Sequence, residues 1–279
     1  MNVIEKLKEL YADGSKHDNY QNLPVFVQKE LGFNVTIDEN WRGDTARYNY
    51  FVDTLKFKAG EKIADIGANT GFFTLSLADK YPQSTFIAYE LNPQHVHFIN
   101  EIAAHFKMAN VQTRNIPVDM VGAEKMETLD YMLHFNVLHH AGVDFDKEKI
   151  NDLPAYREYC IKYLSLLKNA TTHLIYQMGY NWGGNKLNPI IPLQNDLEKI
   201  TYTLDLFSHS GWKLNSIALC RKVNGTHILE NVPQHFIDEL LIIAAGKENA
   251  SQDLMDYLKM FNFEGLSEFY RRPIFNVSK

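Results

Sequence analysis

A glycine-rich turn and a later acidic residue are the first features of this sequence that point to binding chemistry. The turn reads DIGANTGF at residues 65–72, and Glu90 closes a second apolar run at 85–89. Glycines permit tight backbone geometry and let a ligand approach the main chain. A helix that starts there offers free N–H groups, which favour an anion such as a carboxylate. The Glu90 carboxylate is placed to accept hydrogen bonds from both hydroxyls of a ribose.

The spacing of the glycines excludes two common nucleotide motifs. The G-x-G-x-x-G fingerprint of nicotinamide cofactors is absent, and so is a phosphate loop that ends in Lys-Ser or Lys-Thr. The spacing here is G-x-x-x-G, preceded by Asp65. A glycine-rich turn alone leaves other nucleotide-binding folds open, because a fold does not by itself give a function.

A pair of histidines, His139 and His140, follows a further apolar run. A neutral histidine suits the removal of a proton from a hydroxyl, because its ordinary pKa lies near neutral pH. We expect one of the pair to be a general base; the alternative is that the pair only shapes a pocket. Neither Asp144 nor Asp146 forms a recognisable metal-ligand motif with the pair, so no metal is expected. Helical histidines elsewhere, such as His95, are expected at the surface.

Strand-like and helical runs alternate over most of the chain and must position these residues. Strands are expected at 63–66, 85–89, 111–118, 129–135, 172–178 and 213–219, and helices at 72–81, 94–106 and 155–168. This alternation predicts βαβ units and a parallel sheet. Ligands of such sheets bind beyond the carboxyl ends of the strands. The residues expected to contact a ligand are therefore 65–71, Glu90 and 136–140.

Composition narrows the class of protein. The chain has 279 residues, of which 45% are hydrophobic and 22% charged, as in ordinary globular proteins. Two cysteines, Cys160 and Cys220, are too few for a secreted disulfide framework, so a reduced, cytoplasmic protein is expected. The first residues do not form a signal peptide, and no apolar run approaches the roughly 20 residues that span a bilayer. The net charge of -6 argues against a broad nucleic-acid-binding surface.

At the glycine-rich turn the sequence resembles the class I S-adenosylmethionine (SAM)-dependent methyltransferases. Their first motif is an acidic residue and a glycine-rich turn, often D-x-G-x-N-x-G, and a second acidic residue closes their second strand, as Glu90 does. The resemblance covers about 61–219 and implies an α/β, Rossmann-like, doubly wound and mostly parallel sheet of seven strands. The pattern of strand-like and helical runs divides the chain into an N-terminal helical or lid segment at 1–58, a SAM-binding core at 59–225 and a C-terminal helical extension at 226–279.

The resemblance further implies which residues contact the cofactor. Glu90 would hold the ribose, Leu91 would pack on the adenine, and Asp119 would meet the adenine amino group. Asn136 would line the methionine end of SAM. The residues of the turn that would surround the methionine portion are Asp65, Gly67, Ala68, Asn69, Gly71 and Phe72. S-adenosylhomocysteine would be the product.

The segment before the core carries a tryptophan and two arginines. Trp41 and Arg42 are expected to form a lid that contacts the substrate, and Arg47 is expected to pair with the SAM carboxylate. The segment is similar to the W-x-x-D stretch of the tRNA wobble-uridine carboxymethyltransferase family. The chain departs from that family at the fourth strand, where it has His139 and His140 in place of a tyrosine. An ordinary surface turn is the alternative interpretation.

Later loops supply the other candidates for substrate binding. Tyr180 and Trp182 lie in a glycine-rich loop after the fifth strand, where aromatic rings suit a small ring or a sugar and also suit simple packing. Arg271 and Arg272 lie in a basic and aromatic tail and are expected to bind a phosphate or carboxylate of the acceptor. The alternative is a tail that docks its aromatic rings and leaves its charges in water.

Three functions are compatible with these residues. The favoured one is O-methylation of a small molecule, such as a sugar, a phosphorylated metabolite or a natural-product intermediate, for example in a surface-polysaccharide pathway. The second is a tRNA-modifying enzyme on the same fold, and the third is a non-catalytic SAM-binding partner subunit. A small-molecule acceptor is expected rather than nucleic acid or a membrane, and both a homo-oligomer and a complex with a partner subunit stay open.

Overall fold

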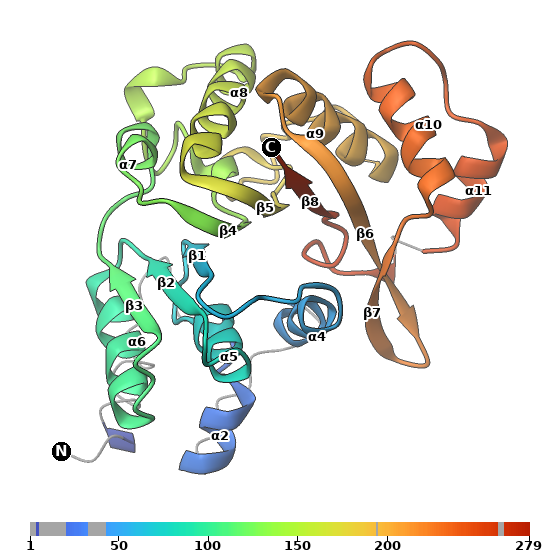
Figure 1. Ribbon diagram of the computed structural model, residues 1–279. Helices are drawn as coiled ribbons and strands as arrows, with labels where there is room; N and C mark the ends of the chain where they lie inside the picture. Colours follow the sequence, from blue (N-terminus) through green and yellow to red (C-terminus); the bar gives the residue numbers. More distant parts are fainter. Residues whose placement is uncertain (1–3, 6–20, 33–42, 194, 262–264) are drawn as a thin grey trace. The chain divides into compact units, whose positions relative to one another are not determined.

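The computed structural model describes residues 4–5, 21–32, 43–193, 195–261 and 265–279, and the chain divides into two compact units (Figure 1). Unit 1 consists of Met1–Val118 and Leu129–Leu133, and unit 2 of Asp119–Thr128 and His134–Lys279. The predicted lid residues Trp41 and Arg42 lie outside the described residues. The predicted boundaries at 58/59 and 225/226 stay predictions.

Unit 1 is a parallel sheet with helices packed on it. Its elements are α2 (Val25–Leu31), α4 (Asp44–Thr54), β1 (Lys62–Ile66), α5 (Phe72–Lys80), β2 (Thr85–Tyr89), α6 (Pro93–His105), β3 (Val111–Arg114) and the Leu129–Leu133 part of β4 (Leu129–Phe135). The strand order is β3-β2-β1-β4, and β2 pairs in parallel with both β1 and β3. Because Ile66 is paired with Tyr89, the glycine-rich turn and Glu90 follow the carboxyl ends of neighbouring strands.

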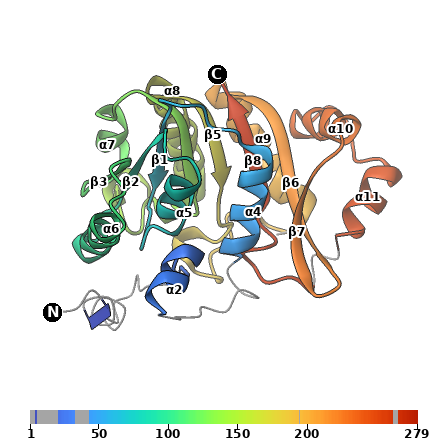
Figure 2. The same cartoon turned by 60° about the horizontal axis from the view of Figure 1, so that its bottom comes forward.

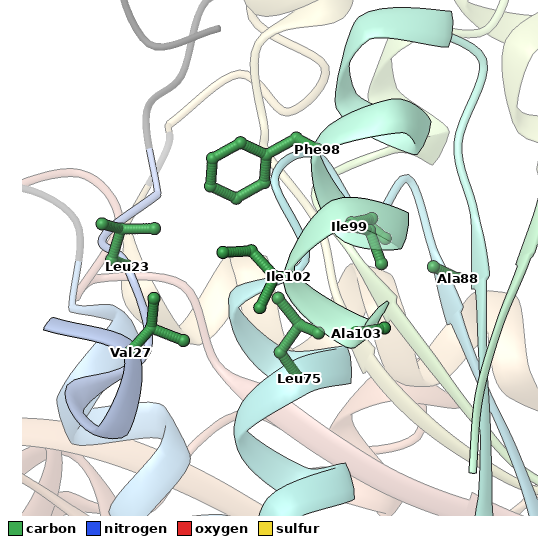
Figure 3. Close-up of a cluster of buried hydrophobic side chains, with 9 residues drawn as sticks. Leu23, Val27, Leu75, Ala88, Phe98, Ile99, Ile102 and Ala103 are labelled. Atoms are coloured by element: carbon green, nitrogen blue, oxygen red, sulfur yellow. The ribbon is translucent and has the colours of Figure 1, made fainter. Parts of the chain in front are cut away.

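An apolar cluster fixes the helices of unit 1 around the turn (Figure 3). The cluster joins α2, α5, α6, β2 and the turn itself, through Leu23, Val27, Ala68, Leu75, Ala88, Phe98, Ile99, Ile102 and Ala103. The four members from α6 recur at the spacing of one helical face, which is the pattern that buries a stripe of an amphipathic helix. Since Ala68 belongs to the cluster, packing of the core also holds the glycine-rich turn in place.

Unit 2 contains the remaining strands, with α8 and α9 packed against them (Figure 2). Its helices are α7 (Met120–Glu124), α8 (Leu153–Ala170), α9 (Asp196–Ser210), α10 (Gln234–Ala244) and α11 (Gln252–Lys259), and its 3-10 turns are η1 (Leu138–His140), η2 (Lys147–Lys149) and η3 (Trp182–Gly184). Its strands are residues 134–135 of β4, β5 (Thr171–Gln177), β6 (Lys213–Val223), β7 (Thr226–Asn231) and β8 (Ile274–Ser278), in the order β4-β5-β8-β6-β7. The last strand along the chain, β8, pairs antiparallel with both β5 and β6.

The α/β class is confirmed, and two details differ from the prediction. The described residues form eight strands rather than seven, because β6 turns at Asn224 and Gly225 into β7. Both turn residues have positive φ angles, 49° and 83°, as a two-residue type I′ hairpin requires. The segment 226–279, predicted as helical, therefore contributes β7 and β8 as well as helices.

A stacking contact between two aromatic rings joins helices α10 and α11 of unit 2. Phe236 of α10 stacks on Tyr257 of α11, with ring centroids 4.5 Å apart.

In the part of the chain that the structure describes, no helix combines the length and the apolar character needed to cross a membrane.

Candidate functional site

The glycine-rich turn of unit 1 is held close to the end of β2. The N–H groups of Gly67 and Ala68 both donate to the Tyr89 carbonyl oxygen, at 2.8 and 3.2 Å. The φ angles of Gly67, Asn69 and Gly71 are 68°, 51° and 81°, in the left-handed region that glycine adopts readily and asparagine tolerates. A Cβ atom at Gly71 would lie 2.7 Å from Cγ1 of Ile99 in α6. Glycine is therefore required there by both conformation and space.

Asp65 joins the end of β1 to the first turn of α5. Its Oδ2 accepts hydrogen bonds from the backbone N and the Oγ1 of Thr74, at 3.2 and 2.8 Å. Burial raises the pKa of the Asp65 carboxyl to about 6, although the hydrogen bonds from Thr74 favour the ionised form. Asp65 thus helps to set the direction of α5; its contact with a cofactor stays a prediction.

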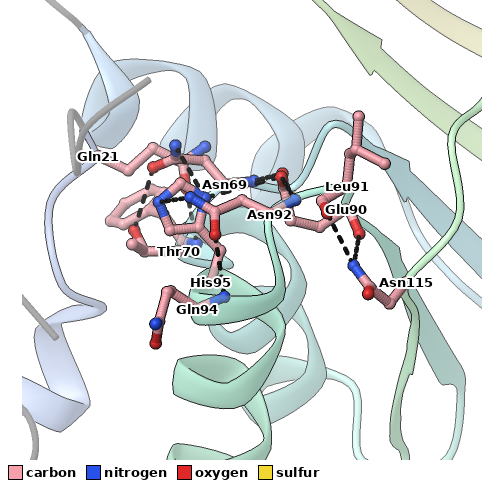
Figure 4. A network of polar contacts seen from close by, with 10 residues as sticks. Gln21, Asn69, Thr70, Glu90, Leu91, Asn92, Gln94, His95 and Asn115 are labelled. Atoms are coloured by element: carbon pink, nitrogen blue, oxygen red, sulfur yellow. Dashed lines mark hydrogen bonds and ion pairs between the residues drawn. The ribbon is translucent and has the colours of Figure 1, made fainter. Parts of the chain in front are cut away.

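The Glu90 carboxylate bridges the turns that follow β1 and β2 (Figure 4). Its Oε2 accepts from the backbone N of Asn69 at 2.7 Å, and its Oε1 accepts from the backbone N of Asn92 at 2.8 Å. Asn115 Nδ2 donates to the carbonyl oxygens of Glu90 and Leu91, at 2.9 Å each. Each carboxylate oxygen has two lone-pair directions, so each can accept one more hydrogen bond. The held carboxylate therefore keeps the capacity to bind a pair of hydroxyls.

The prediction that His95 lies at the surface is wrong. His95 is only 5% exposed, and its Nδ1 lies 3.5 Å from Nδ2 of Asn69 and 3.7 Å from Oε1 of Glu90. The signal that could have placed it is the start of α6. Asn92 caps this helix by accepting from the N–H of Gln94, so His95 belongs to the first turn, which faces back toward the strand end.

Arg47 and the start of α5 are engaged by residues of the same unit. Arg47 is buried, its Nη2 lies 2.5 Å from Oδ1 of Asp44, and its guanidinium lies over the Phe73 ring at 4.9 Å. Its charge lowers the pKa of Asp65, against the effect of burial. The Phe72 N–H at the start of α5 donates to Oε1 of Gln21 at 3.1 Å. The predicted pairing of Arg47 with the SAM carboxylate stays a prediction.

In unit 2, the end of β4 forms a closed polar network with the segment before β8. Asn136 has a φ of 59°; its Nδ2 donates to Oε1 of Gln177 at 3.2 Å, and its Oδ1 accepts from Nη1 of Arg272 at 2.8 Å. Gln177 Nε2 donates to the Arg272 carbonyl oxygen at 2.8 Å. The structure thus brings together Asn136, predicted for the cofactor, and Arg272, predicted for the acceptor.

The two histidines of η1 lie in different environments. Their ring centroids are 4.1 Å apart. His139 is 4% exposed, and a Cβ atom on Gly179 would lie 2.8 Å from its ring. Burial holds the pKa of His139 well below its ordinary value, so its imidazole is neutral. His140 is partly exposed, and its Nδ1 lies 2.7 Å from Oδ2 of Asp144. A tight turn creates this pair, because the Asp144 N–H donates to the His140 carbonyl oxygen at 2.9 Å.

The aromatic residues after β5 support this part of unit 2. Trp182 Nε1 donates to the Ala141 carbonyl oxygen at 2.7 Å, which anchors the loop that follows the histidines. The Tyr180 hydroxyl donates to the Lys199 carbonyl oxygen at 3.1 Å.

Asp119 caps α7 by accepting from the Gly122 N–H at 2.8 Å. The predicted contacts of Trp182, Tyr180 and Asp119 with acceptor or adenine stay predictions.

A cavity of about 490 Å³ lies in unit 2 beside the segment before β8. Its lining residues are Tyr180, Asn181, Lys186, Leu193, Lys199, Glu268, Arg271 and Arg272. Of the four residues predicted to bind substrate within the described chain, three belong to this lining, and Trp182 does not. Lys199 was not predicted, because it belongs to α9 and lies far from any motif. Glu268 was not singled out either, although it precedes Arg271 by three residues in the basic and aromatic tail. Among the described residues, no group of three or more His, Cys, Asp or Glu side chains is arranged to hold a metal ion.

Comparison with known proteins finds a recognised domain in part of the chain. Residues 64–153 match a family model described as a methyltransferase domain. No curated protein matches the chain. A solved structure of WbdD with a kinase inhibitor shares 16% identity at a TM-score of 0.50, over 82% of this chain and 46% of that one. This likeness shows the fold.

Two further structures show weaker likeness. Another WbdD structure, described as a bifunctional kinase-methyltransferase, shares 15% identity at a TM-score of 0.43, over 68% of this chain and 38% of that one. Magnesium protoporphyrin IX methyltransferase from Synechocystis PCC 6803 with bound SAM shares 12% identity at a TM-score of 0.46, over 80% and 86%. The chain spans less than half the length of these WbdD structures.

The segment that matches the family model contains the glycine-rich turn, Glu90 and both histidines of η1. The features that predicted a cofactor site therefore coincide with the matched domain. Residues 64–153 therefore match a methyltransferase domain, and SAM is the cofactor that the sequence predicts for this segment.

Proposed function

We propose that this enzyme methylates a hydroxyl oxygen of a small-molecule acceptor and that His140 is the general base. The observation that carries the proposal is the contact of 2.7 Å between His140 Nδ1 and Asp144 Oδ2. A carboxylate this close to Nδ1 favours the tautomer with the proton on that nitrogen, in which Nε2 is the basic site of the ring. Such a pair is suited to take a proton from a hydroxyl.

The residues of unit 1 fit SAM. The held Glu90 carboxylate has one further acceptor direction on each oxygen for the ribose hydroxyls. The glycine-rich turn keeps its backbone open to a ligand, since Gly67 and Gly71 carry no side chain. Leu91 follows directly and is 62% exposed, which suits an apolar surface for the adenine. We assign the methionine portion to Asp65 and the turn.

When bound, SAM supplies an electrophilic methyl group. The task left to the protein is to orient the acceptor hydroxyl and to receive its proton, because the oxygen is a stronger nucleophile once the proton leaves. In the proposed mechanism Nε2 of His140 accepts that proton. The Asp144 carboxylate then stabilises the imidazolium by its negative charge close to Nδ1.

His139 has a different role in this proposal. Its imidazole is buried and its pKa lies well below the ordinary value, so it is a poor proton acceptor at neutral pH. Its ring lies close to both the His140 ring and Gly179. We assign His139 to positioning the His140 ring. The sequence left the choice between the two histidines open, and their burial and partners favour His140.

The acceptor is proposed to be a sugar, a phosphorylated metabolite or a natural-product intermediate, the classes that the sequence favoured. The basic and polar cavity in unit 2 supports a polar acceptor. The tRNA-modifying alternative rested on Trp41 and Arg42, which lie outside the described residues, and no observation on the described chain favours it.

The test combines binding and turnover on the full-length chain. Calorimetric titration with S-adenosylhomocysteine is expected to show micromolar binding that Glu90→Ala abolishes. A panel of hydroxyl acceptors is then screened for release of S-adenosylhomocysteine from SAM, with matched amine analogues as the control panel. Turnover restricted to amines would overturn O-methylation, and absence of cofactor binding in the wild type would overturn the proposal as a whole.

A further inference from the structure

Positive charge exceeds negative charge in the cavity of unit 2. The cavity walls include four cationic side chains, Lys186, Lys199, Arg271 and Arg272, and one acidic side chain, Glu268. One further carboxylate, Asp196 at the start of α9, lies 3.3 Å from Lys199 Nζ and 3.9 Å from Arg271 Nε. In the described part of the chain, these two carboxylates thus lie beside four cationic side chains.

Each of the two carboxylates is shared. Asp196 faces both Lys199 and Arg271 through the same oxygen. Glu268 pairs through Oε1 with Nη2 of Arg272 and accepts from Nδ2 of Asn181 at 3.3 Å, and the charge of Lys186 further lowers its pKa. Since neither acid can neutralise two cations, the cluster retains about two positive charges.

Two of the four cationic side chains are shielded from water. The side chains of Lys199 and Arg272 are 7% and 6% exposed, and burial lowers the pKa of Lys199. Nε of Arg271 is buried and has no hydrogen-bond partner among the described residues, since Asp196 lies beyond hydrogen-bond distance. Buried positive charge is unfavourable, and an anion in the cavity would relieve it.

We propose that the cavity binds an anionic group of the methyl acceptor, a carboxylate or a phosphate, through Arg271, Lys186 and Lys199. The inference rests on the proposed function, because it assigns the cavity to the acceptor. Arg272 links the cavity to the end of β4, since its Nη1 donates to Asn136 in the same segment that leads to η1. An anion held here fixes one end of the acceptor within the unit that carries His140. Arginine suits this task because its planar guanidinium matches both oxyanions.

The variant for the test removes charge without breaking close contacts. Lys186 is exposed, and the nearest carboxylate to Arg271 is 3.9 Å away, so the double variant Lys186→Gln, Arg271→Gln should fold. The matched control is Lys222→Gln, Arg221→Gln on β6. It removes the same charge, and its arginine pairs with Glu230 at the surface, outside the cavity lining.

The probes are inorganic phosphate and acetate, each titrated against the full-length chain at constant ionic strength. Binding is followed by broadening of the ³¹P or ¹³C resonance of the probe. The wild type and the control are expected to bind at least one probe equally well. The double variant should bind at least about tenfold more weakly, as expected for lost hydrogen bonds to charged groups. The stronger probe indicates whether the acceptor carries phosphate or carboxylate.

Titration with S-adenosylhomocysteine on the same samples separates the two proposals. If the cofactor product binds but neither probe does, or if the control loses probe binding as much as the double variant, the anion site is wrong and O-methylation stands. If the wild type fails to bind S-adenosylhomocysteine, the proposed function fails, whatever the probes do. Equal probe binding by wild type and double variant would also overturn the anion site.

Discussion

The Asp144 carboxylate contacts Nδ1 of the His140 ring. The two residues lie on one tight turn, and the Oδ2–Nδ1 distance is 2.7 Å. Both side chains are partly exposed, with relative exposures of 29% and 26%. The neighbouring His139 is buried, and its pKa is held low. Two adjacent histidines are therefore made chemically different by burial and by one carboxylate.

Replacement of His140 should separate proton transfer from cofactor binding. We expect His140→Gln to lower kcat by roughly 10²–10⁴-fold, the usual contribution of a general base, with unchanged affinity for S-adenosylhomocysteine. Asp144→Asn should lower kcat less, because the imidazole remains but its tautomer is no longer fixed. Steady-state kinetics on the identified acceptor and calorimetry provide the two readouts. Full activity of His140→Gln would remove this histidine from the mechanism.

Glu90→Gln should weaken cofactor binding while it preserves the shape of the side chain. The amide lacks the negative charge and can use only one oxygen as an acceptor. Loss of charged hydrogen bonds worth about 1.5–3 kcal/mol corresponds to roughly 10- to 100-fold in the dissociation constant for S-adenosylhomocysteine. Glu101→Gln on α6 is the control, because it makes the same chemical change on the same unit outside the turn. An affinity equal to that of the wild type would mean that Glu90 only supports the turn.

Asp65 should make the stability of the protein depend on pH. Its folded-state pKa of about 6 lies above its ordinary value of 3.8, so the folded state binds the proton more tightly than the unfolded state. Its contribution to stability is fully present below about pH 4 and is lost as the pH rises to about 6, by about 3 kcal/mol.

Denaturant unfolding of the wild type and Asp65→Asn between pH 4 and 7.5 tests this assignment. The difference in free energy of unfolding between the two proteins should change in favour of the variant as the pH rises. The variant is also expected to lose cofactor affinity, so its gain in stability would be obtained at the expense of function. Parallel pH dependence in both proteins would show that Asp65 does not titrate in this range.

Gly71→Ala should destabilise the protein more than an alanine at another left-handed glycine of unit 1. Gly71 and Gly60 have φ angles of 81° and 85°, but only Gly71 has a neighbour, Ile99, where a Cβ would lie. Gly60→Ala should cost about 1–3 kcal/mol from backbone strain alone. Gly71→Ala should add about 1–3 kcal/mol from overpacking. The double variant Gly71→Ala, Ile99→Ala should recover part of this added cost in stability. Urea unfolding measures the free energy of unfolding of all three variants. Equal losses of stability in the two single variants would contradict the steric argument.

Local signals account for the parts of the fold and site that the sequence predicted. The strand, glycine-rich turn and helix at 63–80, and the carboxylate after β2, depend on residues close together in the chain. β8 was missed because its partners β5 and β6 lie far away in the sequence, and its residues follow a basic, aromatic stretch. The hairpin at Asn224 and Gly225 had a local signal, since this dipeptide is typical of a type I′ turn. The predicted SAM-binding core ends at residue 225, so the prediction includes no strand after this turn.

The polar neighbours of the site were less accessible to sequence reasoning. His95 was assigned to the surface from its helical context, but the cap at Asn92 directs it toward the strand end. The contact between Arg272 and Asn136 joins residues 136 positions apart, and no spacing rule predicts such a pair. Tertiary packing also gives His139 and His140 different environments, although they are adjacent in the sequence.

The position of β8 affects how the protein can be synthesised. Because β8 lies between β5 and β6, the ribosome releases both flanking strands before the strand that joins them. Until then, β5 and β6 each present an unpaired edge, the kind of surface that recruits foreign strands into aggregates. Arg271 and Arg272 come immediately before β8, so the cationic cavity can assemble only after this late insertion. A nascent chain that stalls before β8 would therefore be prone to aggregation and would lack the proposed anion site.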